Sequence, residues 1–193
     1  MNIWNLTKLF TRMFALKATP SEVPFSITLL SFLAGIFLIS KAAAYLWFVR
    51  IVNNYDTQQI MHLSVWGSLI VVAMWLLILF ASVRSLLSYY KLQERTVQVV
   101  TSFIAMDCFL TILFILWLFA LSVVKLPLAT GSLGSFSIVL GFILLMYWQF
   151  MVYIHILINS VNISIIKAGV FALFYQLFQH NVAEIVMNFI IKA

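Results

Sequence analysis

The stretch TVQVVTSFIAMDCFLTILFILWLFALSVVK, residues Thr96 to Lys125, decides the fold of this chain. It is almost wholly apolar and long enough to cross a bilayer as one α-helix. Asp107 nevertheless lies near its middle, with Cys108 beside it and Thr111 one helical turn further on. An ionisable side chain is costly inside a bilayer, so Asp107 must face a partner or a cavity within the protein. We therefore expect this segment to be the central helix of a small bundle.

The composition indicates that the rest of the chain also lies largely in lipid. Of the 193 residues, 65% are hydrophobic and only 8% are charged, whereas a soluble domain carries about 25% charged residues. So few charges cannot cover a water-facing surface, which indicates an all-α, polytopic membrane helix bundle in contact with the lipid bilayer. The net charge of +6 comes from residues that flank apolar runs, where they orient a membrane protein, and no nucleic-acid partner is expected.

The chain divides into an N-terminal segment and a membrane domain. In residues 3–17 (IWNLTKLFTRMFALK), apolar and polar side chains fall on opposite arcs of a helix, which predicts an amphipathic helix in the membrane interface. Pro20 and Pro24 follow it, and residues 1–24 are taken as this interfacial segment. Residues 25–193 are predicted to form about five transmembrane helices, at about 25–48, 63–84, 97–124, 136–158 and 164–191. Aromatic residues near the span ends are interpreted as interface anchors: Trp47, Trp66, Tyr89, Tyr90 and Tyr153.

The last span has two interpretations. One helical stripe of this span is formed by Gly169, Ala172, Gln176, Gln179 or His180, Ala183 and Met187, and Glu184 borders it. A long helix that turns this polar stripe to the bundle and its apolar back to lipid accounts for the pattern. The alternative is a span that ends near residue 178 and continues as an amphipathic tail on the membrane surface.

The basic residues predict an orientation. With a cytoplasmic N-terminus, seven lysines and arginines fall on inner segments and three on outer ones. This bias favours five spans in a bacterial inner (cytoplasmic) membrane, with the C-terminus on the outer side. The inner residues are Lys8, Arg12, Lys17, Arg84, Lys91, Arg95 and Lys167, and the outer ones are Arg50, Lys125 and Lys192.

Three ionisable residues lie well inside the predicted spans: Lys41, Asp107 and Glu184. We expect an intramembrane polar cluster of Lys41, Asp107, Thr111, Gln176, His180 and Glu184. Lys41 is within reach of Asp107 and of Glu184, and the sequence does not decide which of them it pairs with or whether all three form one shared cluster. One interpretation is a buried ion pair or hydrogen-bonded knot that fixes helix register. A proton or ion relay, or side chains that reach interfacial water without pairing, are the other two.

Motifs for other chemistry are missing from the sequence. The three histidines and the single cysteine lack the spacing of a metal site, and Cys108 is interpreted as a small buried hydrophobe. No nucleophile elbow, zinc-protease motif or phosphate loop is present. We therefore expect no enzyme activity, no cofactor and no metal. An enzyme acting on lipid through Asp107 or His180 ranks last among the hypotheses.

The layout resembles that of bacterial members of the Yip-type family of five-span membrane proteins. The resemblance rests on TPSEVPFSITLL before the first span, RTVQVVTSFIAMDCFLTILFILWLF around the third, and WQFMVYIHILINSVNISIIKAGVFALFYQLF across the last two. The segments of the third and last spans are similar to those of small uncharacterised bacterial inner-membrane proteins. The resemblance implies the topology only, because the acidic soluble N-terminal region of eukaryotic members has no counterpart here and no residue role carries over.

Two functions follow from these patterns. The first is a non-enzymatic structural or accessory component, either a membrane organiser or a small subunit of an envelope assembly, which would contact other membrane proteins or copies of itself. The alternative is a small oligomeric transporter or channel subunit with an intramembrane polar pathway. The short loops and small-residue helix faces favour the first, and the ionisable residues inside the spans favour the second.

Overall fold

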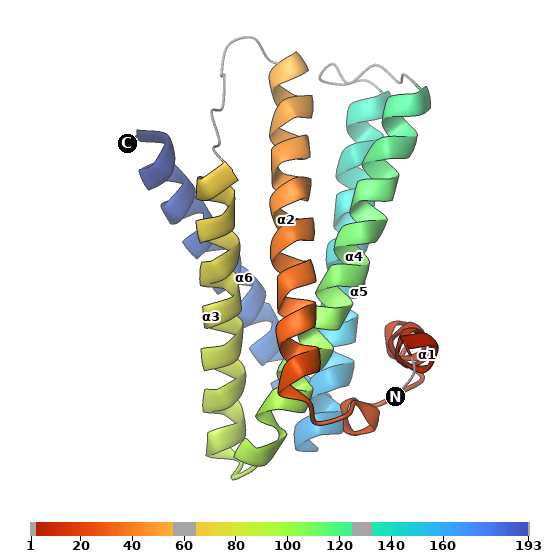
Figure 1. Cartoon of the computed structure of the whole chain (residues 1–193), viewed down its shortest axis with the longest axis vertical. Coiled ribbons are helices and arrows are strands. Elements are labelled where there is room, and N and C mark those ends of the chain that lie inside the picture. The colour runs from red at the N-terminus through yellow and green to blue at the C-terminus, as the bar shows by residue number, and fades with distance from the viewer. Residues whose placement is uncertain (1–2, 56–64, 125–132, 193) are drawn as a thin grey trace.

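The computed structural model describes residues 3–55, 65–124 and 133–192, and within these ranges the chain is helical with no strand. Five long helices alternate in direction along the bundle, and the last of them crosses behind the others at a tilt (Figure 1). The predicted all-α bundle is therefore confirmed. The long helices are α2 (Ile27–Tyr55), α3 (Val65–Tyr89), α4 (Thr96–Val124), α5 (Leu133–Val161) and α6 (Ile165–Lys192).

Four helices in the described part are long and apolar enough to cross a membrane, and the chain is a polytopic membrane protein. The apolar part of α6, Ile165–Phe178, is shorter. The helix itself continues without a break to Lys192, as the longer of its two interpretations requires. The membrane location of the second half of α6 remains a prediction. The four apolar stretches are Ile27–Ala44, Trp66–Tyr89, Gln93–Ala120 and Phe136–Val161.

Helix α4 is the central helix of the bundle, as its sequence predicts. Half of its apolar stretch is buried inside the protein, compared with 17–22% for the other three. It contacts α2, α3 and α5 along its length, while α6 packs against α3 and α5. Because α4 meets so many neighbours, polar side chains on it face protein rather than lipid.

Helices α4 and α5 approach closely at Gly141. A Cβ atom at this position would lie 2.7 Å from Nε1 of Trp117 on α4, closer than side-chain atoms approach one another. Glycine therefore allows the two helices to come together, as small residues do at helix interfaces in membranes. This contact brings the first half of α5 against the second half of α4.

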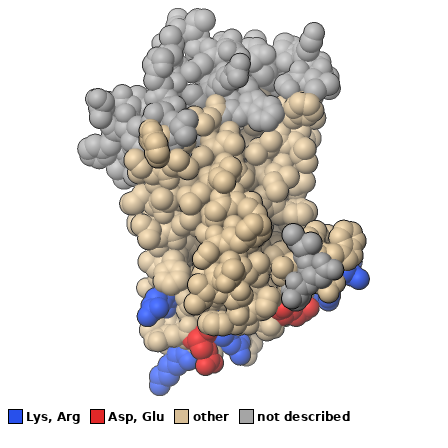
Figure 2. All heavy atoms as spheres, viewed as in Figure 1, with Lys and Arg blue, Asp and Glu red and all other residues tan. Residues whose placement is uncertain are grey.

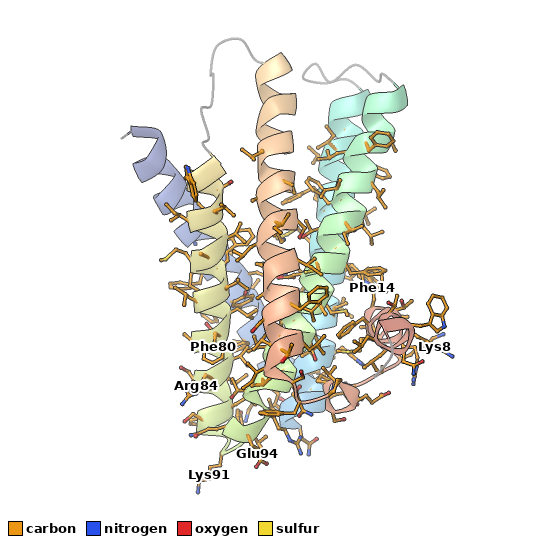
Figure 3. All side chains as sticks on the ribbon, viewed as in Figure 1. Lys8, Phe14, Phe80, Arg84, Lys91 and Glu94 are labelled. Atoms are coloured by element: carbon orange, nitrogen blue, oxygen red, sulfur yellow. The ribbon has the colours of Figure 1, made fainter. Side chains whose placement is uncertain are left out.

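The N-terminal helix α1 (Ile3–Phe14) lies across the bundle rather than along it, and Figure 1 shows it almost end-on. Its apolar side packs inward: Met13 is fully buried, and the Phe14 ring lies 4.7 Å from the Phe109 ring on α4. Figure 3 shows Phe14 directed toward the bundle and Lys8 away from it. The short 3₁₀ helix η1 (Pro20–Glu22) then leads into α2.

Side-chain contacts tie this N-terminal segment to the bundle. Gln98 Nε2 donates to the Val23 carbonyl at 3.0 Å, and a ring nitrogen of His155 lies 3.0 Å from the Ala18 carbonyl oxygen. Within the segment, Arg12 and Glu22 form an ion pair at 3.5 Å. These contacts anchor the segment to α4 and α5 at the end of the bundle where α2 begins.

Charged residues gather at that same end. Lys, Arg, Asp and Glu side chains cluster at the lower end of the face in Figure 2, below a broad band without charges. Figure 3 places Arg84, Lys91 and Glu94 there, around the turn between α3 and α4 that contains η2 (Gln93–Arg95). An uncharged band above a charged end is the pattern expected of a bundle whose middle is in lipid.

Candidate functional site

The carboxylate of Asp107 is fully buried and is held by two side chains of α5. Its Oδ1 atom accepts hydrogen bonds from Tyr153 Oη at 2.6 Å and from Gln149 Nε2 at 2.8 Å. Gln149 Nε2 also donates to Tyr153 Oη at 2.8 Å, which closes a triangle. We refer to Asp107, Gln149 and Tyr153 as the Asp107 cluster. The cluster is a hydrogen-bonded knot between two membrane helices.

Tyr153 is the residue that the sequence analysis placed wrongly. It was expected at the membrane interface, but it is completely buried. Its ring lies 4.6 Å from the Phe103 ring and 5.6 Å from the Tyr175 ring, and its hydroxyl group is turned to Asp107. From sequence alone, a tyrosine near a predicted span end is interpreted as an interface anchor, because the sequence does not show which face of its helix is turned toward the other helices. Here the register of α5 places it beside a buried acid.

Gln149 and Tyr153 were absent from the predicted polar cluster, although a signal for them is present. They are four residues apart on α5, so their side chains lie on the same helix face. Each carries a donor that can reach a carboxylate. A search for donors at helical spacing, rather than for opposite charges, would have found them.

Lys41 does not form the expected ion pair with Asp107. Within the described residues, the one ion pair with nitrogen and oxygen within 4 Å joins Arg12 and Glu22. The Lys41 Nζ atom lies instead 5.2 Å from the centre of the Trp75 ring and 5.7 Å from that of Phe37. Lys41 and Asp107 attract each other electrostatically across the wider gap. The hydrogen-bonded knot, rather than the direct ion pair, therefore describes Asp107.

Two neighbours of Asp107 on α4 have local roles. The Thr111 hydroxyl donates to the backbone carbonyl of Asp107 at 2.7 Å, so it does not bind the carboxylate. Cys108 is buried, and its Sγ atom lies 3.8 Å from the Leu33 carbonyl oxygen on α2. The interpretation of Cys108 as a small buried hydrophobe is confirmed.

A cavity of about 530 Å³ lies beside the Asp107 cluster, among all five long helices. Its polar lining consists mainly of Lys41, Thr111, Gln149 and Gln176, so Gln149 belongs to both the cluster and the cavity. Its volume falls within the range of roughly 300–1,000 Å³ that is typical of small-molecule sites. The remaining walls are largely apolar: Ala44, Trp75, Leu110, Phe114, Ile138, Val139, Phe142, Leu145 and Met146. We call this space the Lys41 cavity.

Two buried polar atoms near the cavity have no hydrogen-bond partner among the described residues. They are Nε2 of Gln176, on the cavity wall, and Oδ2 of Asp107, beneath it. A buried polar group without a partner costs free energy. The site therefore retains unused hydrogen-bonding capacity. The side chains of His180 and Glu184, also predicted here, lie outside the described part of α6.

The described side chains around the cavity include few groups that could react. In the described ranges, no three His, Cys, Asp or Glu side chains come together as a metal site. The arrangement offers an apolar chamber with a cation and amide groups at one side. Such a chamber can hold a molecule with a polar end and an apolar body.

Comparisons with known proteins add no assignment. No family model matches the chain, and no curated protein or solved structure matches it either. The resemblance of its layout to the Yip-type family therefore stays a prediction. The functional argument rests on the site itself.

Proposed function

We propose that the chain is a non-enzymatic membrane protein that binds a small lipophilic molecule in the Lys41 cavity, as a carrier or transport subunit. The observation that carries this proposal is a cavity of about 530 Å³ between the helices that is lined by Lys41, a residue without an ion pair among the described side chains. A purely structural bundle gains nothing from a lysine in such a space, because a charged side chain among apolar walls in a membrane costs free energy. The cavity is therefore better explained by an occupant.

The sequence favoured a structural or accessory component over a transport subunit. The cavity reverses that order in our proposal. The Asp107 cluster supports the structural element that both hypotheses share, because it fixes α5 against α4. The Lys41 cavity is an additional feature, and only a binding role uses it.

The test of this proposal compares two neighbouring positions on α5. Leu145 lines the cavity, whereas Leu144 is 58% exposed on the outside of the helix and is not part of the lining. Leu145→Trp places an indole in the cavity, and Leu144→Trp adds the same bulk to the lipid-facing side. Both variants and the wild type are extracted gently, and the bound small molecules are measured by native mass spectrometry.

We expect the wild type and Leu144→Trp to retain a small-molecule adduct that Leu145→Trp has lost. The single cysteine serves as the folding control, because buried Cys108 should resist maleimide labelling in every folded variant. Equal adducts in all three proteins would refute a ligand in the cavity. So would the absence of any adduct from the wild type after exposure to lipid extract.

We further propose that the charged end of the bundle faces the cytoplasm of a bacterium and that the C-terminus lies on the outer side. The support is the cluster of basic residues at this end, which includes Arg84 and Lys91 (Figure 3). Topology reporters fused after Glu94 and after Ala193 test this orientation. We expect a cytoplasmic signal from the first and an external one from the second. A cytoplasmic signal from the C-terminal fusion would contradict five spans with an inner N-terminus.

A further inference from the structure

The charges around the Lys41 cavity indicate which class of molecule it holds, if the proposed binding function is correct. Among the lining residues that the structure describes, Lys41 is the charged one, and none is an aspartate or a glutamate. A positive charge in an apolar chamber attracts an anion and repels a cation. The charge on the described lining of the cavity is therefore positive.

The ammonium group of Lys41 has unused bonding capacity. It is held between the Trp75 and Phe37 rings, with its Nζ atom 5.2 and 5.7 Å from their centres. Aromatic faces stabilise a cation but accept none of its hydrogen bonds in the ordinary sense. An ammonium has three donors, and within the described part of the chain no hydrogen bond or ion pair of Lys41 is present. An anionic oxygen in the cavity would supply a hydrogen-bond acceptor for the ammonium group, which the described residues do not provide.

Asp107 does not take this place. Its Oδ1 atom is engaged by Gln149 and Tyr153, and its Oδ2 atom has no hydrogen-bond partner among the described residues. Neither oxygen lies within 4 Å of Lys41 Nζ, and the residue is fully buried and outside the cavity lining. Its attraction for Lys41 acts across a gap wider than 4 Å. This attraction weakens the binding of an anion, but it leaves the donors of the ammonium free. A ligand oxygen can therefore reach Lys41 without displacing an existing ion pair.

The opposite wall of the cavity is suited to an apolar tail. Phe114 and Phe142 pack edge to face across α4 and α5, with ring centres 6.3 Å apart. Val139 and Phe142 line the cavity and are also 56% and 48% exposed. In a bundle whose middle lies in lipid, exposed side chains of this kind connect the cavity with the bilayer. This opening would admit a lipophilic molecule from the bilayer, with its apolar tail lying along α5.

We infer that the Lys41 cavity takes a single-chain amphiphile with an anionic oxygen headgroup, which Lys41 recognises. Carboxylates and phosphate esters share this chemistry. A cationic amphiphile would meet the charge of Lys41, and a neutral one would leave its ammonium without an acceptor. Gln176, whose amide nitrogen has no partner, provides a second donor on the same cavity wall.

The test uses the full-length protein in nanodiscs of neutral lipid and four probes with the same alkyl chain: palmitate, hexadecyl phosphate, hexadecanol and hexadecylamine. Binding is measured by displacement of a fluorescent fatty acid. We expect the wild type to bind at least one of the two anions about tenfold more tightly than the alcohol or the amine, because a charge-assisted hydrogen bond is at stake. The ratio of palmitate to hexadecyl phosphate shows whether the carboxylate or the phosphate is preferred.

Lysine variants test whether the preference for anionic probes depends on Lys41. Lys41→Met should remove the preference for anions while hexadecanol still binds, and Lys41→Arg should retain the preference. Lys91→Met is the matched control, because Lys91 is exposed at the charged end (Figure 3) and should change nothing. An unchanged preference in Lys41→Met, or equal binding of all four probes by the wild type, would overturn the anion assignment and leave the binding function intact. If no probe binds to the wild type, the assignment and the proposed function both fail.

Discussion

Tyr153→Ala should abolish most of the stability of the folded bundle. The residue is completely buried, packs against Phe103 and Tyr175, and donates to Asp107. Truncating a buried aromatic side chain to alanine costs about 3–5 kcal/mol, and the loss of a donor to Asp107 adds to this. Unfolding in mixed micelles of mild detergent and dodecyl sulfate measures the free energy of unfolding.

Tyr147→Ala is the control, because it removes the same side chain from the same helix at a position that is 60% exposed. We expect its effect to stay within about 0.5 kcal/mol. Tyr153→Phe separates the ring from the hydroxyl group and should cost about 1–3 kcal/mol, since the buried carboxylate loses a donor. Equal effects of Tyr153→Ala and Tyr147→Ala would show that Tyr153 is not part of a packed core.

Asp107→Leu should have the second large effect. The leucine cannot accept a hydrogen bond, so the buried Tyr153 hydroxyl loses its acceptor at Oδ1, and Gln149 keeps only its bond to Tyr153 Oη. Each buried group left without a partner costs about 1–3 kcal/mol. Asp107→Asn keeps an acceptor oxygen at this position and should retain more of the free energy of unfolding, measured in the same micelles. A leucine variant as stable as the asparagine variant would mean that these hydrogen bonds contribute little.

The fold could be predicted because its main determinants are local. Long apolar runs separated by short polar segments identify membrane helices, and lysines and arginines collect at one end of the bundle. The central position of α4 could also be predicted from Asp107, because a buried acid requires protein on its side of the helix. None of these inferences needs the relative rotation of the helices.

The partners of Asp107 could not be predicted, because they depend on that rotation. Opposite charge and a similar depth in the membrane predict Lys41 as a partner. The actual partners, Gln149 and Tyr153, are neutral, and their distance from Asp107 depends on how α5 turns against α4. Sequence periodicity alone does not reveal this rotation.

The cavity is even harder to predict from the sequence than the partners of Asp107. Lys41, Thr111 and Gln176 were all expected in one polar cluster, and the structure does place them around a common space. The apolar walls depend on side-chain volumes from four helices at once. Whether those volumes fill the interior or leave a chamber follows only from the packed structure.

The central claim of this account is that hydrogen bonds from α5 hold Asp107 and thereby leave Lys41 to the cavity. Two double-mutant cycles measured in the same micelles test it most directly, one pairing Asp107→Leu with Tyr153→Phe and the other pairing Asp107→Leu with Lys41→Met. We expect a coupling energy of about 1–3 kcal/mol between Asp107 and Tyr153, and a smaller one between Asp107 and Lys41. A larger coupling between Asp107 and Lys41 would contradict the account, because it would make Lys41 the main partner of the buried acid.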